Sequence, residues 1–503
     1  MSNLPSYLAA AKPVPWANRA PWYKTIMPAY IGVMLWFVFW QDLVTGGMKP
    51  CPPAGMLALN FFPAFFGMII AAVICHFLFY MAPAMLGMST GLPLYVVGTS
   101  TYGARGGLFM PGFLMGLLQF GWLAVNAFFV AGILCKCFGL DPTAPGLQHG
   151  IIAAAFVILA AFVGLKGISY VGRVGTYLPL IPIVVLLILL VNTWSGLSGA
   201  KESNFLYPIM IHEPTNEAEK AIYIKQHTDH AARPPQLTTS WQIIGTMCIY
   251  VVGFFATAGA AGADIAMNSR NKDDVHTGGI AGILLPTVLA GGATMFIVVG
   301  AYGSNLVPPE LVGNYNPVDL MPCILGSKFA NVLLIALAIS AFPGACFSSF
   351  IAANSFKTTM PKVNPLISVG LGALAAIALA VTGVVGSVIW VFQVIGASFG
   401  PVCGAMLADY LMAGRKWSGP RAGFNPAGWV SWTVGFIVGA FNLVVGLLLK
   451  WPWAVERLPN LADYMDYVPV PPVTAFVVGF ALYVLLSVVG ARTRKLEMPE
   501  ATE

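Results

Sequence analysis

One apolar stretch carries three polar or aromatic side chains at helical spacing. Gln119, Trp122 and Asn126 stand three and four residues apart in the run LLQFGWLAVNAFF, so an α-helix places them on one face. An indole ring between two carboxamides can stack on a flat heterocycle and hydrogen-bond to its edge. Polar residues of this kind also tie membrane helices together, and the spacing alone favours neither interpretation.

Residues 241–270 form a second candidate region, an apolar span whose later half is crowded with glycine and alanine. Broken helices in secondary transporters bind substrates near the bilayer midplane through freed backbone groups. We therefore predict an interrupted helix whose backbone opens from Gly253 to Thr257, where Phe254 or Phe255 could cover the second face of a planar ligand. The alternative is close helix packing through small residues.

Hydroxyl groups suited to a small cation occur in another apolar span. Ser348 and Ser349 are adjacent, and Asn354 follows Ser348 by six residues. Small hard cations prefer oxygen ligands. Carbonyl groups freed around Gly32 and Trp36, in a first span that also holds Pro28, would complete a sodium site. Serines that bond back to their own helix are the alternative.

Other chemistry finds little support in the sequence. Cys135 and Cys137 form a lone C-x-C pair without the second ligand pair of a zinc site. Asp42 and Asp409 are acids within apolar spans, but both fall near span ends. The sequence contains no nucleophile-base pair, P-loop or paired catalytic acids. We therefore expect neither an enzyme nor an ATP-driven pump, and no cofactor other than a coupling ion.

The composition of the chain indicates which kind of structure holds these candidate residues. The 503 residues are 58% hydrophobic and only 9% charged, against about 25% charged in soluble chains, so we predict an all-α polytopic membrane protein with the lipid bilayer as its partner. No basic run suits nucleic acid. Twelve apolar spans are near the length that crosses a bilayer, at residues 25–45, 56–81, 109–135, 149–165, 174–194, 241–262, 278–303, 329–355, 365–384, 386–412, 428–449 and 472–491.

The charge distribution predicts orientation and organisation. Lysine and arginine are more numerous in the loops on the side of both termini, which places these termini in the cytoplasm and the chain in the inner or plasma membrane. Interrupted spans five apart predict an inverted repeat of five plus five helices. We expect a cytoplasmic tail (1–24), a first repeat (25–194), a solvated external loop (195–240), a second repeat (241–412), two peripheral helices (413–491) and a second cytoplasmic tail (492–503).

Several stretches across the first ten spans together resemble the nucleobase:cation symporter family, which includes purine and cytosine permeases, and most closely its cytosine permease branch. Residues 83–106 resemble the family's loop after the second helix, with its T-G-x-P element at Gly91-Leu92-Pro93 and its F-G-x-x-G element from Tyr102 to Gly106, where Tyr102 stands in place of the usual phenylalanine. The segment Gln119 to Trp122 resembles the Q-x-G-W motif of the cytosine branch. Residues 251–271 resemble that branch's sixth helix and the loop after it.

The resemblance implies a leucine-transporter-type fold and alternating access. It implies that Trp122 and Phe255 sandwich a ring, that Gln119 hydrogen-bonds to its edge, and that Asn354 contacts substrate as in the hydantoin-transporting branch. Sodium ligands would come from Gly32, Trp36, Ala345, Ser348 and Ser349. Ala345 matches the hydantoin branch, which favours sodium over protons. It stands where the cytosine branch has asparagine, and Phe254 replaces smaller residues, so the transported heterocycle stays open.

We therefore expect a symporter that imports a nucleobase or related small heterocycle with sodium, or alternatively with protons. An ion-independent channel or facilitator for a small polar solute is the competing hypothesis. Survival of uptake after the sodium and proton gradients collapse would distinguish it. The sequence does not indicate an oligomeric state.

Overall fold

The computed structural model describes residues 4–45, 61–166, 177–200, 239–308, 311 and 314–498. Within these ranges the chain is nearly all helical, and ten helices are long and apolar enough to cross a membrane. α21 is a shorter apolar helix, and the first span is divided in two, so the count of twelve crossings stays a prediction. Most of the predicted external loop (195–240) lies outside the described residues.

The apolar segments follow the predicted order along the chain. Their bounds are α2 Ile26–Met34, α3 Phe37–Gln41, α4 Phe61–Ile74 continuing through η3 Cys75–Tyr80 and α5 Met81–Thr90, η4 Leu108–Phe113 with α8 Leu114–Phe138, α9 Leu147–Leu165, α11 Leu180–Thr193, α14 Ser240–Ala260, α16 Lys272–Gly279 with η6 Ile280–Leu284 and α17 Leu285–Gly303, α19 Ser327–Ser340 with α20 Phe342–Thr359, α21 Pro365–Val381, α22 Val388–Met412, α23 Pro426–Leu448, and α25 Pro471–Val488.

The long helices sort into groups by their packing. Helices α8, α9, α20 and α21 all pack against one another. The broken first span packs on η6, α17 and α15 (Gly262–Ala266), while α4 packs on α14 and α17. Helices α22, α23 and α25 form a third set, of which α22 and α25 pack on α14. We call the first set the scaffold group, and α2 to α4, α14 and α17 the bundle group.

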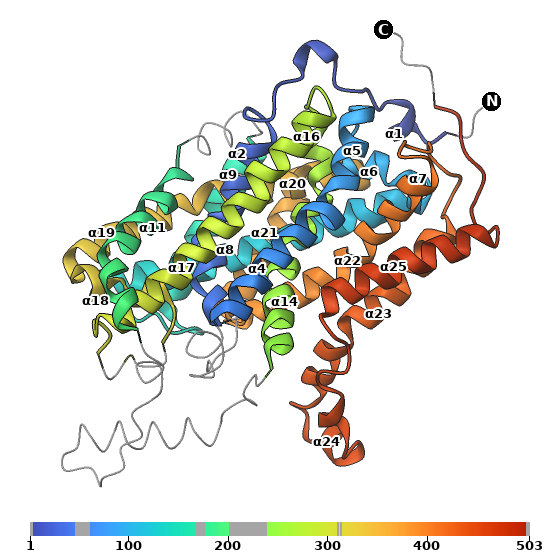
Figure 1. Ribbon diagram of the computed structural model, residues 1–503. Helices are drawn as coiled ribbons and strands as arrows, with labels where there is room; N and C mark the ends of the chain where they lie inside the picture. The colour runs from blue at the N-terminus through green and yellow to red at the C-terminus, as the bar shows by residue number, and fades with distance from the viewer. Residues whose placement is uncertain are drawn as a thin grey trace.

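The first and last described segments of the chain lie at the same end of the molecule, close to α1 (Ser6–Ala9) and α7 (Thr99–Tyr102), whereas α18 (Pro317–Leu325) and α24 (Pro452–Arg457) lie at the opposite end (Figure 1). The N-terminal segment packs on the protein. Leu8 is fully buried, and the guanidinium of Arg19 donates to the carbonyl oxygens of Met88 and Ser269. The described part of the predicted N-terminal tail is therefore packed against the helices.

The helix from Ser240 to Ala260 corrects one prediction. It continues without a break through Gly253 to Thr257, and it ends only at Ala261, before the short helix α15. A Cβ atom added at Gly253 would lie 2.7 Å from the carbonyl oxygen of Phe392 on α22, and one at Gly259 would lie 2.8 Å from Phe79 Cβ. These glycines therefore serve close helix packing, the alternative interpretation of their crowding.

Candidate functional site

The first apolar span is interrupted in its middle, as its sequence predicts. α2 ends at Met34, and Trp36 has an extended backbone (φ −58°, ψ 125°) before α3 begins at Phe37. The break frees carbonyl groups from helical hydrogen bonds. The Leu35 carbonyl accepts the indole N–H of Trp40 at 3.1 Å, and the Phe39 carbonyl accepts the hydroxyl of Tyr250 at 2.8 Å. The break is thus held by aromatic donors, and it presents the ring of Trp36 to its neighbours.

Six aromatic residues meet at this break and form what we call the central cluster. The ring of Trp36 stacks on Phe254 of α14, with centroids 6.2 Å apart and planes at 21°, and it meets Trp122 of α8 edge-on at 5.8 Å. Phe254 lies 5.4 Å from both Trp122 and Phe392. The members are Trp36, Phe39, Trp122, Tyr250, Phe254 and Phe392.

Trp122 connects the two helix groups. Its indole N–H donates a 3.0 Å hydrogen bond to the hydroxyl of Thr257 on α14. Trp122 and Thr257 are 8% and 3% exposed, so water does not compete strongly for either group. The bond joins α8 of the scaffold group to α14 of the bundle group and fixes the plane of the indole ring inside the cluster.

Two carboxamides accompany Trp122 on α8, as their spacing predicts. Gln119 is 6% exposed, and its amide faces the sulfur of Met115 one turn earlier at 3.4 Å. Asn126 is 5% exposed, and its Oδ1 has no hydrogen-bond partner among the residues that the structure describes. A buried acceptor without a partner costs about 1–3 kcal/mol. Asn126 therefore offers an acceptor that a ligand with an N–H group can satisfy.

The structure separates the two phenylalanines of α14. Phe254 lies against Trp122, whereas the ring of Phe255 packs 5.7 Å from Tyr30 and next to Gly259. Consecutive residues of a helix point about 100° apart, so only one can face α8. In this arrangement Phe254 replaces Phe255 as the partner of Trp122 expected from the family resemblance.

Among the described residues, no hydrogen bond joins the predicted sodium ligands of α20 to those of the first span. Ser349 donates to the carbonyl of Ala345 on its own helix at 3.1 Å, and it lies against α9, where a Cβ at Gly164 would approach its own to 2.6 Å. Ser348 is buried, and a Cβ at Gly32 would meet Pro179. A sodium site between α20 and the broken first span stays a prediction.

Asn354 stands apart from the central cluster. It is exposed, and six residues advance a helix by about 9 Å and turn it away from the face of Ser348. Ser355, seven residues after Ser348, occupies that face instead, and its hydroxyl donates to the carbonyl of Gly112. The structure therefore does not bring Asn354 to the other candidate substrate ligands.

Three members of the central cluster, Phe39, Tyr250 and Phe392, were not predicted from the sequence. Phe392 comes from α22 and Phe39 from α3, and both lie in apolar runs where a phenylalanine carries no distinctive spacing. Only the close approach of α22 to Gly253 brings Phe392 beside Phe254. The contact depends on the tertiary packing of helices far apart in sequence.

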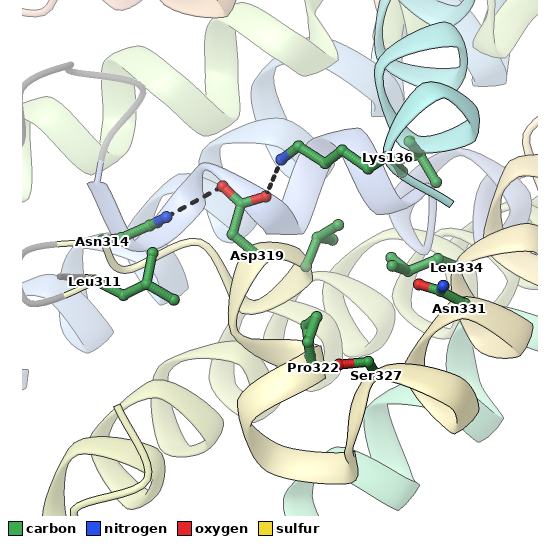
Figure 2. A pocket seen from close by; sticks show the side chains of 10 residues that line it. Lys136, Leu311, Asn314, Asp319, Pro322, Ser327, Asn331 and Leu334 are labelled. Carbon is green, nitrogen blue, oxygen red and sulfur yellow. Dashed lines mark hydrogen bonds and ion pairs between the residues drawn. The ribbon is translucent and has the colours of Figure 1, made fainter. Parts of the chain in front are cut away.

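A separate polar pocket of about 430 Å³ lies at the end of the molecule opposite the termini, between α8, α18 and α19 (Figure 2). Lys136 at the end of α8 forms a 2.6 Å ion pair with Asp319 in the first turn of α18, and Asp319 also accepts the amide of Asn314 at 3.2 Å. The ion pair between Lys136 and Asp319 links α8 of the scaffold group to α18, in the segment that follows α17.

Solved structures provide the comparison that decides the fold. No family model matches the sequence, and no curated protein matches it. The inward-facing structure of Mhp1 matches with a TM-score of 0.59 and 14% identity over 98% of this chain and 95% of that one. The chain has the fold of Mhp1.

Two further structures of this fold match. Mhp1, described as a nucleobase-cation-symport-1 family transporter, matches in a closed conformation with bromovinylhydantoin bound, with a TM-score of 0.62, 13% identity, and 98% and 97% of the two chains covered. A substrate-bound, outward-open Na⁺-coupled sialic acid symporter matches with a TM-score of 0.53, 14% identity, and 96% and 92% coverage. These matches confirm the all-α fold class expected from the sequence.

Proposed function

We propose that the chain is a secondary active transporter that imports a neutral, planar heterocycle related to nucleobases or hydantoins by symport with sodium. The observation that carries the proposal is the central cluster, which lies where the broken first span meets α8, α14 and α22 in a fold of the Mhp1 type. Alternating access would arise from movement of the bundle group against the scaffold group.

The chemistry of the cluster supports this class of substrate. Aromatic rings dominate it, and no ionised side chain belongs to it, so a neutral flat ring fits better than a charged solute. The carboxamides of Gln119 and Asn126 and the hydroxyl of Thr257 can form hydrogen bonds with the N–H and C=O groups of such a ring. The rings contact one another in this structure. A planar substrate would therefore displace one ring and stack on the ring that this ring now covers.

Sodium coupling is the finer part of the proposal. Ser348 and Ser349 are buried on α20, and the break at Leu35 and Trp36 provides backbone carbonyls. Hydroxyl and carbonyl oxygens suit a hard monovalent cation. The central cluster contains neither a carboxylate nor a histidine, which favours sodium over a proton carried at the substrate site.

A ligand screen by thermal unfolding tests the substrate class. Hydantoin, 5-substituted hydantoins, cytosine, uracil and purines are each added to the purified protein, with and without sodium. A ligand at 100 times its Kd stabilises the folded state by about 2.7 kcal/mol, so binding raises the melting temperature. We expect at least one ring to do so, more strongly with sodium. A Trp122→Ala variant should lose this shift while still unfolding cooperatively.

Uptake measurements on the protein in lipid vesicles test the facilitator hypothesis. A channel or facilitator equilibrates its solute equally fast with or without an ion gradient. A symporter accumulates it only when an inward gradient is imposed.

A further inference from the structure

A basic cavity lies at the end of the molecule that carries both termini, away from the central cluster. Its volume is about 690 Å³, and five segments line it. They are the N-terminal segment, the turn before η4, the end of α20, the loop before α23 and the C-terminal segment, represented by Tyr7, Arg105, Thr358, Gly423 and Arg494. No carboxylate lines the cavity among the described residues.

The backbones of the two arginines that line the cavity are hydrogen-bonded to one short loop. The backbone N–H of Arg105 donates to the carbonyl of Gly423 at 2.8 Å, and the carbonyl of Arg494 accepts the N–H of Ala422 at 2.9 Å. Their backbones are thus attached to consecutive residues, although they are far apart in sequence. The loop fixes two cationic side chains at the wall of one cavity.

Neither guanidinium is neutralised within the described chain. The ion pairs there join Lys136 to Asp319, Arg270 to Asp274 and Arg421 to Asp409. In the C-terminal segment Arg494 and Leu496 line the cavity, whereas Lys495 and Glu497 are not among its lining residues. Two exposed arginines line this cavity, and no acid is among its described lining residues, which favours an anion there.

The rest of the wall is preformed. The hydroxyl of Tyr7 donates to the carbonyl of Ala104, and the hydroxyls of Thr358 and Thr359 donate to carbonyls of their own helix. The arginines are therefore the main donors that the cavity offers to a ligand. Phosphate oxygens accept the paired N–H groups of guanidinium well.

We propose that this cavity binds a phosphate-bearing anion, which holds the two chain termini together at one face of the transporter. Two sources share this chemistry: the headgroup of an anionic phospholipid and a soluble phosphate ester. An exposed apolar rim, in which Phe109 stacks on Phe424 with centroids 6.3 Å apart, adjoins the turn and the loop that carry Arg105 and Gly423. This rim suits the acyl chains of a lipid.

The test uses the full chain in nanodiscs. Discs of dioleoylphosphatidylcholine are compared with discs that contain increasing fractions of dioleoylphosphatidylglycerol, and glycerol 3-phosphate is titrated into the neutral discs. We expect a saturable rise in melting temperature. A rise with the anionic lipid alone identifies a lipid site, and a rise with glycerol 3-phosphate as well identifies a site open to soluble anions.

Variants decide whether the cavity is responsible. Arg105→Gln and Arg494→Gln should each raise the half-maximal ligand concentration about tenfold, the effect of losing one charged hydrogen-bond donor. The control Lys24→Ala/Lys272→Ala removes two exposed charges elsewhere on the chain and should keep the wild-type midpoint. The Arg105→Lys/Arg494→Lys variant keeps both charges and serves if a glutamine variant does not fold, with an expected partial loss. No rise in wild type, unchanged midpoints in the arginine variants, or an equal loss in the control would overturn the proposal.

Discussion

The indole nitrogen of Trp122 and the hydroxyl oxygen of Thr257 lie 3.0 Å apart and form a buried hydrogen bond between α8 and α14. α8 packs on α9, α20 and α21, whereas α14 packs on α4 and α22. The bond therefore crosses between the two helix groups that alternating access would move, at the ring that we expect to stack on substrate. It couples the orientation of that ring to the position of the bundle group.

Removing either partner of this bond should affect stability and ligand binding together. Trp122→Phe keeps an aromatic ring but loses the donor, and Thr257→Val keeps the shape but loses the acceptor. A double-mutant cycle on thermal unfolding should give a coupling of about 0.5–1.5 kcal/mol, the net value of a typical hydrogen bond. Additive effects of the two changes would show that the bond does not form in the membrane.

Gly253 should tolerate no side chain. A Cβ there would lie 2.7 Å from the Phe392 carbonyl oxygen, so Gly253→Ala must push α22 away from α14, at a cost of about 1–3 kcal/mol. Gly245 on the same helix is the matched control, since its added Cβ would lie an ordinary 3.5 Å from Val470. Thermal unfolding of both variants checks this, and equal stability would mean that the helices are not in contact at Gly253.

The paired serines should control the response to sodium. Ser348→Ala and Ser349→Ala each remove one oxygen ligand from the proposed site, so we expect a higher sodium concentration for half-maximal uptake, with substrate binding at saturating sodium largely kept. Ser340→Ala, on the preceding helix α19, is the control. An unchanged sodium dependence in both variants would remove these serines from the ion site.

The ion pair between Lys136 and Asp319 should add little stability. The two side chains are 52% and 25% exposed, and exposed pairs are worth about 0.2–1 kcal/mol. We expect Lys136→Gln to lower the unfolding free energy by no more than this, with the difference from wild type vanishing in 1 M salt, where screening is strong. A larger loss that persists in high salt would indicate a packing role for the lysine stem.

Asp264 should make stability depend on pH. Its carboxylate accepts the N–H of Leu94 at the start of α6 (Leu94–Val97), while burial raises the pKa of Asp264 to about 6. The folded chain then holds a proton that the unfolded chain releases near pH 4, so stability should fall from pH 4 to pH 6 and level off above. Asp264→Asn keeps the acceptor and should flatten this part of the profile. Melting curves from pH 4 to 8 check it, and an identical slope in the variant would contradict the raised pKa.

The break in the first span was predicted around Gly32 and Trp36, and it lies at Leu35 and Trp36, although Pro28 and Gly32 themselves lie inside α2. The glycines crowded in α14 did not allow the sequence to distinguish a broken helix from close helix packing. Glycine signals either an open backbone or a close neighbour, and only the position of α22 decides between them. The prediction of an open backbone from Gly253 to Thr257 was therefore wrong, although the same residues do lie at the junction of the helices.

The face of α8 shows where spacing is reliable. Gln119, Trp122 and Asn126 share one buried face because helical periodicity alone fixes their relation. The rotation of α14 about its axis decides which phenylalanine meets Trp122, and the position of α22 decides whether Phe392 joins the cluster. No local sequence pattern predicts either the rotation of α14 or the position of α22.

Sodium-driven accumulation in proteoliposomes tests the proposed function most directly. Vesicles containing the protein are loaded with potassium buffer and diluted into sodium or choline buffer with a radiolabelled heterocycle that raised the melting temperature. We predict transient accumulation above the equilibrium level in sodium only, abolished in the Trp122→Ala variant. Uptake that reaches equilibrium at the same rate in choline, or that persists in the variant, would contradict a sodium symporter with its substrate at the central cluster.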